Sequence, residues 1–161
     1  MAIPLSDEIK ALLHRPNFAR LATLMADGSP QSVPVWVGRE DDHVVICTGE
    51  GSLKGKNTLR DPRVALSVDD FRDPSEAQLR GRVVERRPDP DLRYMDPISH
   101  KYTGKPFLFR KPEESGARDR GGEGPVYEAA VRTPTARVGT LLSTNSGFFQ
   151  RAVHECNADY Q

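Results

Sequence analysis

Hydrophobic residues recur with helical spacing near the start of the chain. Leu5, Ile9, Leu12 and Leu13 share one face of a short amphipathic helix predicted over 5–13, and the acidic run at Ser6-Asp7-Glu8 is typical of a helix start. After Pro16 the pattern changes to short apolar runs separated by turn residues. We therefore expect one helix followed by strands.

The strand pattern occurs in six segments, 18–25, 31–37, 43–48, 64–69, 77–84 and 126–132. Asp27-Gly28 predicts a hairpin turn between the first two, and the residues 38–42 form a polar link. Gly81 predicts a bulge or a site of close approach, Pro134 is expected to end the sixth strand, and 137–142 would add a short closing strand. Short antiparallel strands with tight turns favour a β-barrel or sandwich with peripheral helices.

Two later regions differ from this pattern. The segment 91–102 is expected to be helical and to end at Gly104, whereas 110–124 is rich in charge, glycine and proline and predicts a loop. We assign 1–142 to a single domain and 143–161 to a C-terminal tail.

Composition excludes some classes of partner but does not identify the function. The 161 residues include 23 lysines and arginines and 23 aspartates and glutamates, so no overall field favours nucleic acid or a membrane as a partner. The first residues do not resemble a signal peptide, and we expect a cytoplasmic protein. His154, Glu155 and Cys156 have no recognisable metal-ligand spacing, so no metal is expected.

The segment 48–63 carries the clearest chemical signal. Ser52 is a candidate N-cap for a helix over 53–60 that Pro62 ends, and Lys54 and Lys56 stand in its first turns. Free amides, the helix dipole and two ammonium groups would suit a phosphate. The alternative is a solvated surface helix.

Pro34 is unusual inside a strand because it removes a ladder hydrogen bond. It fits a strand whose neighbour is a flat heteroaromatic ring stacked on Pro34, Val35 and Trp36. It also fits an edge strand protected against aggregation.

The series LATLMADGSPQSVPVW, VVICT and KGKNTLRDPRVALSVDD resembles the split β-barrel flavin- and deazaflavin-dependent oxidoreductases, relatives of pyridoxamine 5′-phosphate oxidase. The branch that binds the deazaflavin coenzyme F420 is the most similar. The resemblance covers roughly 5–140 and implies a six-stranded antiparallel split β-barrel, closed around its cofactor as a homodimer.

The resemblance also implies a set of cofactor contacts. Those to the ring would come from the second strand and the end of the third, and those to the phosphate from the helix that follows: Gln31, Ser32, Pro34, Val35, Trp36, Thr48, Lys54, Lys56 and Asn57. The family usually has arginine at one phosphate position where this chain has lysine, which keeps the charge but weakens bidentate recognition.

Three functions remain open at this point. The first is an F420-dependent reductase acting on a small conjugated substrate, the second an FMN-dependent oxidase of the pyridoxamine phosphate type, and the third a non-catalytic binder of a cofactor, haem or tetrapyrrole. No nucleophile–base pair is evident, so the cofactor would supply the chemistry. Any proton donor is expected among Tyr94, His100 and Tyr102.

Overall fold

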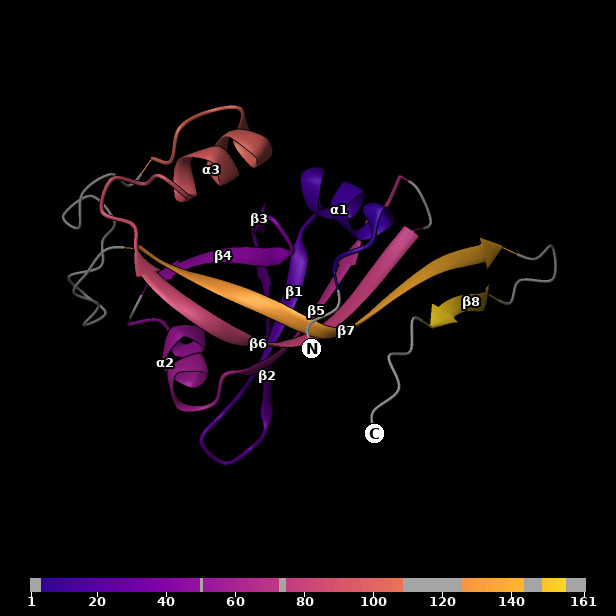
Figure 1. Cartoon of the computed structure of the whole chain (residues 1–161), viewed down its shortest axis with the longest axis horizontal. Coiled ribbons are helices and arrows are strands. Elements are labelled where there is room, and N and C mark those ends of the chain that lie inside the picture. Colours follow the sequence, from indigo (N-terminus) through magenta and orange to yellow (C-terminus); the bar gives the residue numbers. More distant parts are fainter. Residues whose placement is uncertain (1–3, 50, 73–74, 109–125, 144–148, 156–161) are drawn as a thin grey trace.

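The computed structural model describes residues 4–49, 51–72, 75–108, 126–143 and 149–155. Within them, eight antiparallel strands form one sheet in the order β2-β1-β5-β6-β7-β4-β3, with β8 paired to β7 (Figure 1). The strands are β1 Ala19–Leu24, β2 Pro30–Val35, β3 Gly38–Glu40, β4 His43–Gly49, β5 Arg63–Asp69, β6 Ser75–Pro88, β7 Val126–Ser143 and β8 Phe149–Glu155.

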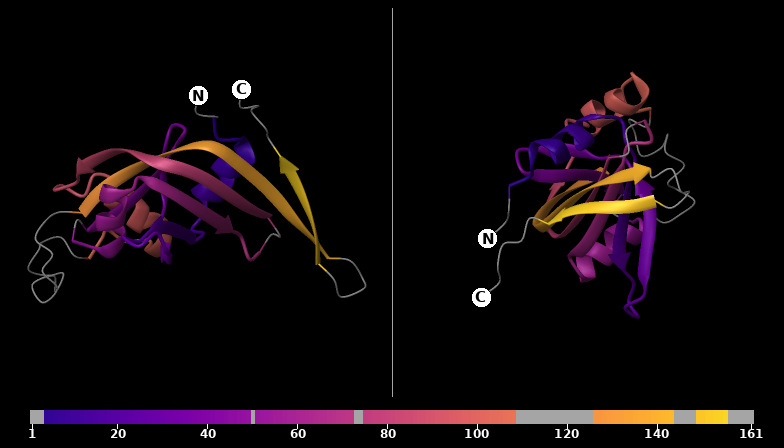
Figure 2. Two further views of the ribbon diagram at one scale, coloured as in Figure 1. Left: turned by 90° about the horizontal axis from the view of Figure 1, so that it is seen from below. Right: turned by 90° about the vertical axis from the view of Figure 1, so that its right-hand side faces the viewer.

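Three helices accompany the sheet: α1 Asp7–His14, α2 Leu53–Arg60 and α3 Met95–Thr103. Figures 1 and 2 place α1 and α3 at one end of the molecule and α2 at the opposite end. In the second figure β7 and β8 extend beyond the other strands. No helix in the described part of the chain is both long and apolar enough to cross a membrane.

The core lies between α1 and the inner face of the sheet. Ile9, Leu12 and Leu13 of α1 are buried, as the helical spacing predicted. Alternate residues of the strands meet them, among them Leu21, Val44, Ile46, Leu66, Val68 and Leu79. Burying this apolar surface is the main term that stabilises the fold.

Local signals placed several elements correctly. The Asp27 carboxylate accepts hydrogen bonds from the N–H and hydroxyl of Ser29, and Gly28 adopts the positive φ of 84° that the hairpin turn requires. The helix α2 has the predicted bounds and cap. Gly104 ends α3 in the left-handed conformation with a φ of 73°.

The start of α3 is later than the sequence predicted. The buried Asp89 carboxylate accepts hydrogen bonds from the N–H groups of Tyr94 and Met95, with the latter at 2.9 Å. Leu92 lies in the left-handed region with a φ of 57°, which is incompatible with a continuing helix. A turn capped by Asp89 therefore replaces the first predicted helical turn.

The strand β7 shows that the expected break at Pro134 is wrong. The strand runs through this proline as far as Ser143, so 126–132 and 137–142 belong to one element. Its pairing with β6 changes register between Arg82↔Arg132 and Arg80↔Thr135, and Pro134 lies in this irregularity. A proline is tolerated there because no ladder hydrogen bond is needed. The same irregularity lies opposite Gly81, where a bulge was predicted, but the extra residue is on β7: Thr133 and Pro134 face the single Gly81.

Other differences concern the number and length of strands. The polar link at 38–42 contains the short strand β3, the strand β6 is longer than 77–84, and the tail contains β8. The six strands of the prediction are thus eight among the described residues. The pairings there form an open path from β2 to β3, and closure into a barrel stays a prediction. The predicted loop at 110–124 lies outside the described residues.

Candidate functional site

The start of α2 is the centre of the candidate anion site. The Ser52 hydroxyl accepts a hydrogen bond from the Gly55 N–H at 3.1 Å and lies 2.9 Å from the Thr48 hydroxyl at the end of β4. Amides in the first turn of a helix have no intrahelical acceptor, and Ser52 serves one of them. The end of β4 and the α2 cap thus form a rigid unit that presents amides at the positive end of a helix dipole.

The two lysines of α2 have different surroundings. Lys54 is half-buried and, with Thr48, lines a small cavity whose other walls include the apolar Leu21, Ile46 and Val64. Burial lowers the pKa of Lys54 below its ordinary value. Lys56 is exposed, because residues two apart on a helix do not share a face. The structure therefore brings Lys54 and Thr48 together and leaves Lys56 on the surface.

Asn57 is buried, with 1% of its surface exposed, and its amide faces the interior. Its Nδ2 donates to the Thr23 hydroxyl and to Gln31 Oε1, both at 3.1 Å, while its Oδ1 accepts from Arg60 at 3.1 Å. The Thr23 hydroxyl also donates to Gln31 Oε1. Two of the expected cofactor contacts, Gln31 and Asn57, thus bind each other and fix α2 to the β1–β2 hairpin.

Sequence reasoning missed three residues of this assembly. Thr23 lies at an inward position of β1, Arg60 donates to the Leu24 carbonyl as well as to Asn57, and Arg86 of β6 donates to the Gly55 carbonyl and the Thr58 hydroxyl. The buried alternation of β1 could have indicated Thr23. No local signal links Arg86 to α2, since the two are joined only across the sheet.

The strand β2 lies at the end of the sheet, as the proline suggested. Ser32 and Pro34 are exposed on one face, while Val35 is buried on the other. Pro34 lies opposite Arg20 of β1. The location fits the protected edge strand, and it also leaves the Ser32 and Pro34 face accessible to a ligand.

Trp36 already has an aromatic partner in the chain. Its ring stacks on that of Tyr102 with centroids 5.1 Å apart and an interplanar angle of 6°. The Tyr102 hydroxyl donates to the Asn17 carbonyl at 2.6 Å and accepts from the Val37 N–H at 3.1 Å. Burial raises the pKa of Tyr102, an effect that the Val37 N–H partly offsets. Tyr102 therefore joins α3 to the segment around Trp36.

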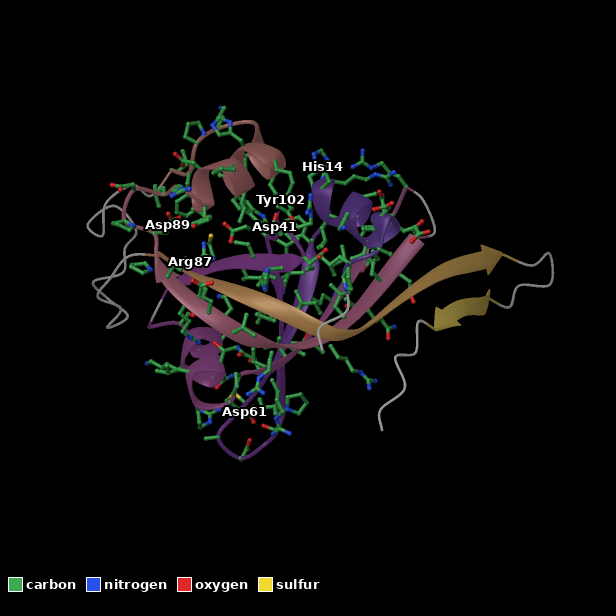
Figure 3. The ribbon with its side chains drawn as sticks, viewed as in Figure 1. His14, Asp41, Asp61, Arg87, Asp89 and Tyr102 are labelled. Atoms are coloured by element: carbon green, nitrogen blue, oxygen red, sulfur yellow. The ribbon has the colours of Figure 1, made fainter. Side chains whose placement is uncertain are left out.

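The other two candidate proton donors are arranged differently. Tyr94 accepts a hydrogen bond from Arg87, which also pairs with Glu40 at 2.9 Å. His100 is exposed on α3. Figure 3 places Arg87 and Asp89 beneath α3, and His14 and Tyr102 in the region between α1 and α3. None of the described residues forms a cluster of three or more side chains suited to a metal ion.

Comparison with solved structures gives the same fold. An F420 reductase has a TM-score of 0.68 at 23% identity, over 82% of this chain and 98% of that chain. A conserved hypothetical protein from Mycobacterium tuberculosis has a TM-score of 0.65 at 20% identity, over 91% and 94%. A candidate pyridoxamine 5′-phosphate oxidase from Lactobacillus delbrueckii has a TM-score of 0.57 at 20% identity, over 83% and 93%.

At these low sequence identities, the similarity to the solved structures concerns the fold alone. Among curated proteins, none matches the chain. A family model described as pyridoxamine 5′-phosphate oxidase matches residues 5–121, which is well over half of the sequence. The chain therefore belongs to the pyridoxamine 5′-phosphate oxidase family.

Proposed function

We propose that this chain is an oxidoreductase that binds coenzyme F420 and transfers a hydride between the deazaflavin and a small conjugated organic substrate. Members of the family use this fold with flavin-type cofactors, and the proposal specifies F420 among them. A solved structure named as an F420 reductase shares that fold.

The observation that carries the proposal is the setting of Lys54. This ammonium group is half-buried, its pKa is lowered by burial, and no ion pair to it is found within the described residues. A charge taken from water without a counterion is costly unless an anion arrives. The capped start of α2 lies directly beside it, so a phosphate would meet an ammonium group and helix amides together.

The ring would lie along β2. Ser32 and Pro34 are exposed on one face of β2, the end strand of the described sheet, and Thr48 at the end of β4 lies next to the Ser52 cap of α2. When bound, the deazaflavin would supply the hydride chemistry. Lys54 would hold the phosphate and Pro34 would orient the ring. Gln31 and Asn57 act on the site indirectly, by fixing α2 to the hairpin.

We also propose that the site is completed by a second copy of the chain. The strand β2 is an edge in the described sheet, and a ligand lying on it would be open to water on its outer side. A two-fold axis would cover it with the same surface of the partner. Exclusion of water would strengthen the electrostatic contacts at Lys54.

Parallel titrations test the cofactor. Purified protein is titrated with F420, FMN and haem, with fluorescence or absorbance as the signal. We expect F420 to bind tightly and to transfer a hydride from its reduced form to conjugated acceptors. Tight FMN binding without a response to F420 would favour the FMN-dependent oxidase instead. Binding of haem alone would favour a non-catalytic carrier.

A further inference from the structure

A cavity of about 640 Å³ lies between α1, β3 and α3, at the end of the molecule away from α2. We call it the α1–α3 cavity. Its volume lies in the range of pockets that hold drug-sized ligands. None of the nine residues expected to contact the cofactor lines it. The proposed function therefore assigns no cofactor contact to this cavity, although two of the candidate proton donors, Tyr94 and His100, line it.

The walls of the cavity are mainly apolar. They are formed by Leu13 of α1, Val45 of β4, and Pro97 and Ile98 of α3, with Gly38 of β3 between them. A Cβ atom at Gly38 would lie 2.9 Å from Ile98 Cγ1, so glycine allows α3 to pack closely against β3 at this point. Such walls suit the flat, apolar body of a small organic molecule.

The charged residues of the cavity are mostly cationic. Arg39, Arg93 and Lys101 line it together with one carboxylate, Glu40. Glu40 is paired with Arg87 through two hydrogen bonds, at 2.9 and 3.4 Å, and Arg87 also pairs with Glu85 at 2.7 Å, so the charge of Glu40 is offset only in part. His14 and His100 add two further nitrogen-bearing groups at the surface. The local field therefore favours an anion.

Two of these cations are held in place by contacts that leave donors for a ligand. The Arg93 guanidinium lies 5.6 Å from the centroid of the Tyr94 ring, and stacking on a ring leaves the N–H groups at its edge available. Lys101 donates to the Leu13 and Val37 carbonyls. An ammonium group has three N–H bonds, so one remains beyond those two, on a nitrogen that also lies 4.8 Å from the centroid of the Tyr102 ring.

We propose that the α1–α3 cavity binds a small organic anion with a flat apolar body, such as an aryl carboxylate or sulfonate. The apolar walls would hold the body, and Arg93 with Lys101 would meet the charged group. This binding does not depend on the cofactor, since α2 and β2 contribute no lining residue.

The probe for this site is 8-anilinonaphthalene-1-sulfonate, whose fluorescence rises in apolar surroundings. Its matched control is N-phenyl-1-naphthylamine, which has the same ring system without the sulfonate. We expect one sulfonate probe bound per chain, at least about tenfold more tightly than the uncharged amine. Such a ratio corresponds to about 1.4 kcal/mol, the contribution of one charge-assisted contact. Equal affinities would overturn the proposal.

Charge reversal then locates the probe. Arg93→Glu should weaken binding of the sulfonate about tenfold and leave the amine unchanged. Arg82→Glu is the matched control, because Arg82 is exposed on β6 and does not line the cavity. His100→Glu, also at an exposed position, provides a second test if Arg93→Glu does not fold. Sulfonate binding within twofold of wild type in a folded variant of either residue contradicts the proposal.

A last variant separates this site from the cofactor site. Lys54→Glu/Lys56→Glu should leave sulfonate binding unchanged, with or without added F420 or FMN. Loss of probe binding in that double variant would place the probe at α2 and overturn the assignment to the α1–α3 cavity. Failure of F420 to bind, with the probe results as expected, would affect the proposed function alone.

Discussion

At the scale of single residues, Asn57 shows how a polar side chain expected to contact a ligand can belong to the interior. Its amide joins α2 to β1 and β2 through Thr23 and Gln31, and its oxygen accepts from Arg60. A buried polar network of this kind rigidifies a structure when its donors and acceptors are satisfied. Asn57 therefore positions α2 whether or not a cofactor is bound.

Asn57→Ala should destabilise the cofactor-free protein by about 1–3 kcal/mol, because it leaves the partners of a buried amide unsatisfied. The free energy of unfolding in urea measures this. Lys56→Ala is the control one position away, at an exposed site, and should change stability by less than about 0.5 kcal/mol. Equal stability of the two variants would show that the Asn57 network contributes little.

We expect Trp36 to contribute to the stability of the cofactor-free protein, because its ring packs within the chain. Trp36→Ala removes the stack on Tyr102, and an aromatic pair contributes about 0.5–1.5 kcal/mol beyond its buried area. The melting temperature of the cofactor-free protein should fall. A double-mutant cycle with Tyr102→Phe separates the ring contact from the two hydrogen bonds of the hydroxyl, since phenylalanine keeps the ring. An unchanged melting temperature with weaker cofactor binding would instead favour a direct contact with the cofactor ring.

Lys101 should titrate far below an ordinary lysine, because burial lowers its pKa to about 8. Between about pH 8 and the ordinary value near 10.5, the unfolded chain binds this proton more tightly than the folded one. The contribution of Lys101 to stability should therefore rise with pH across that window. Urea unfolding of wild type and Lys101→Met at several pH values measures the difference. A pH-independent difference would contradict the lowered pKa.

At the scale of elements, α2 combines a structural and a binding face. Lys54 lies toward the sheet and the small cavity beside Thr48, while Lys56 faces solvent. We therefore expect the two lysines to contribute unequally to a cofactor site, although the sequence alone gives no reason to distinguish them.

Lys54→Glu should lower cofactor affinity more than Lys56→Glu, and the double variant should lower it by several orders of magnitude. At about 4 Å, one pair of unit charges interacts by up to about 4 kcal/mol at an effective dielectric constant of 20, before screening by salt. Fluorescence titration at two salt concentrations measures both effects. Lys105→Glu is the matched control, because Lys105 is exposed and lies outside the proposed site. Wild-type affinity in the double variant would remove the main physical support for the cofactor proposal.

At the scale of the whole molecule, we expect a homodimer. Several apolar side chains are exposed, including Leu53 and Leu59 on α2 and Val84 on β6, with 47%, 71% and 46% of their surface accessible. Such residues near a proposed cofactor groove fit an interface between copies. Light scattering at micromolar concentration should give twice the chain mass of 17.9 kDa. A monomer that still binds cofactor would contradict the shared site.

The sequence by itself determined the elements whose signals lie within a few neighbouring residues. Ser52 and Pro62 bound α2, Asp27-Gly28 forms the first hairpin turn, and Gly104 ends α3. Capping and turn formation depend on the backbone conformation of three to five residues, so a local pattern suffices. The linked order of such patterns was also enough to indicate the family.

Only the tertiary structure decided which side chains meet. Asn57 binds Thr23 from 34 positions away, and Lys101 reaches carbonyl groups 88 and 64 positions away, at Leu13 and Val37. These contacts depend on the register of the sheet and on how α1 and α3 pack over it. The type of a residue determines whether its side chain can donate or accept a hydrogen bond. Its partner depends on which distant segment the fold brings within about 3 Å. For this reason the same sequence predicted the anchor at α2 and gave no sign of the cavity between α1 and α3.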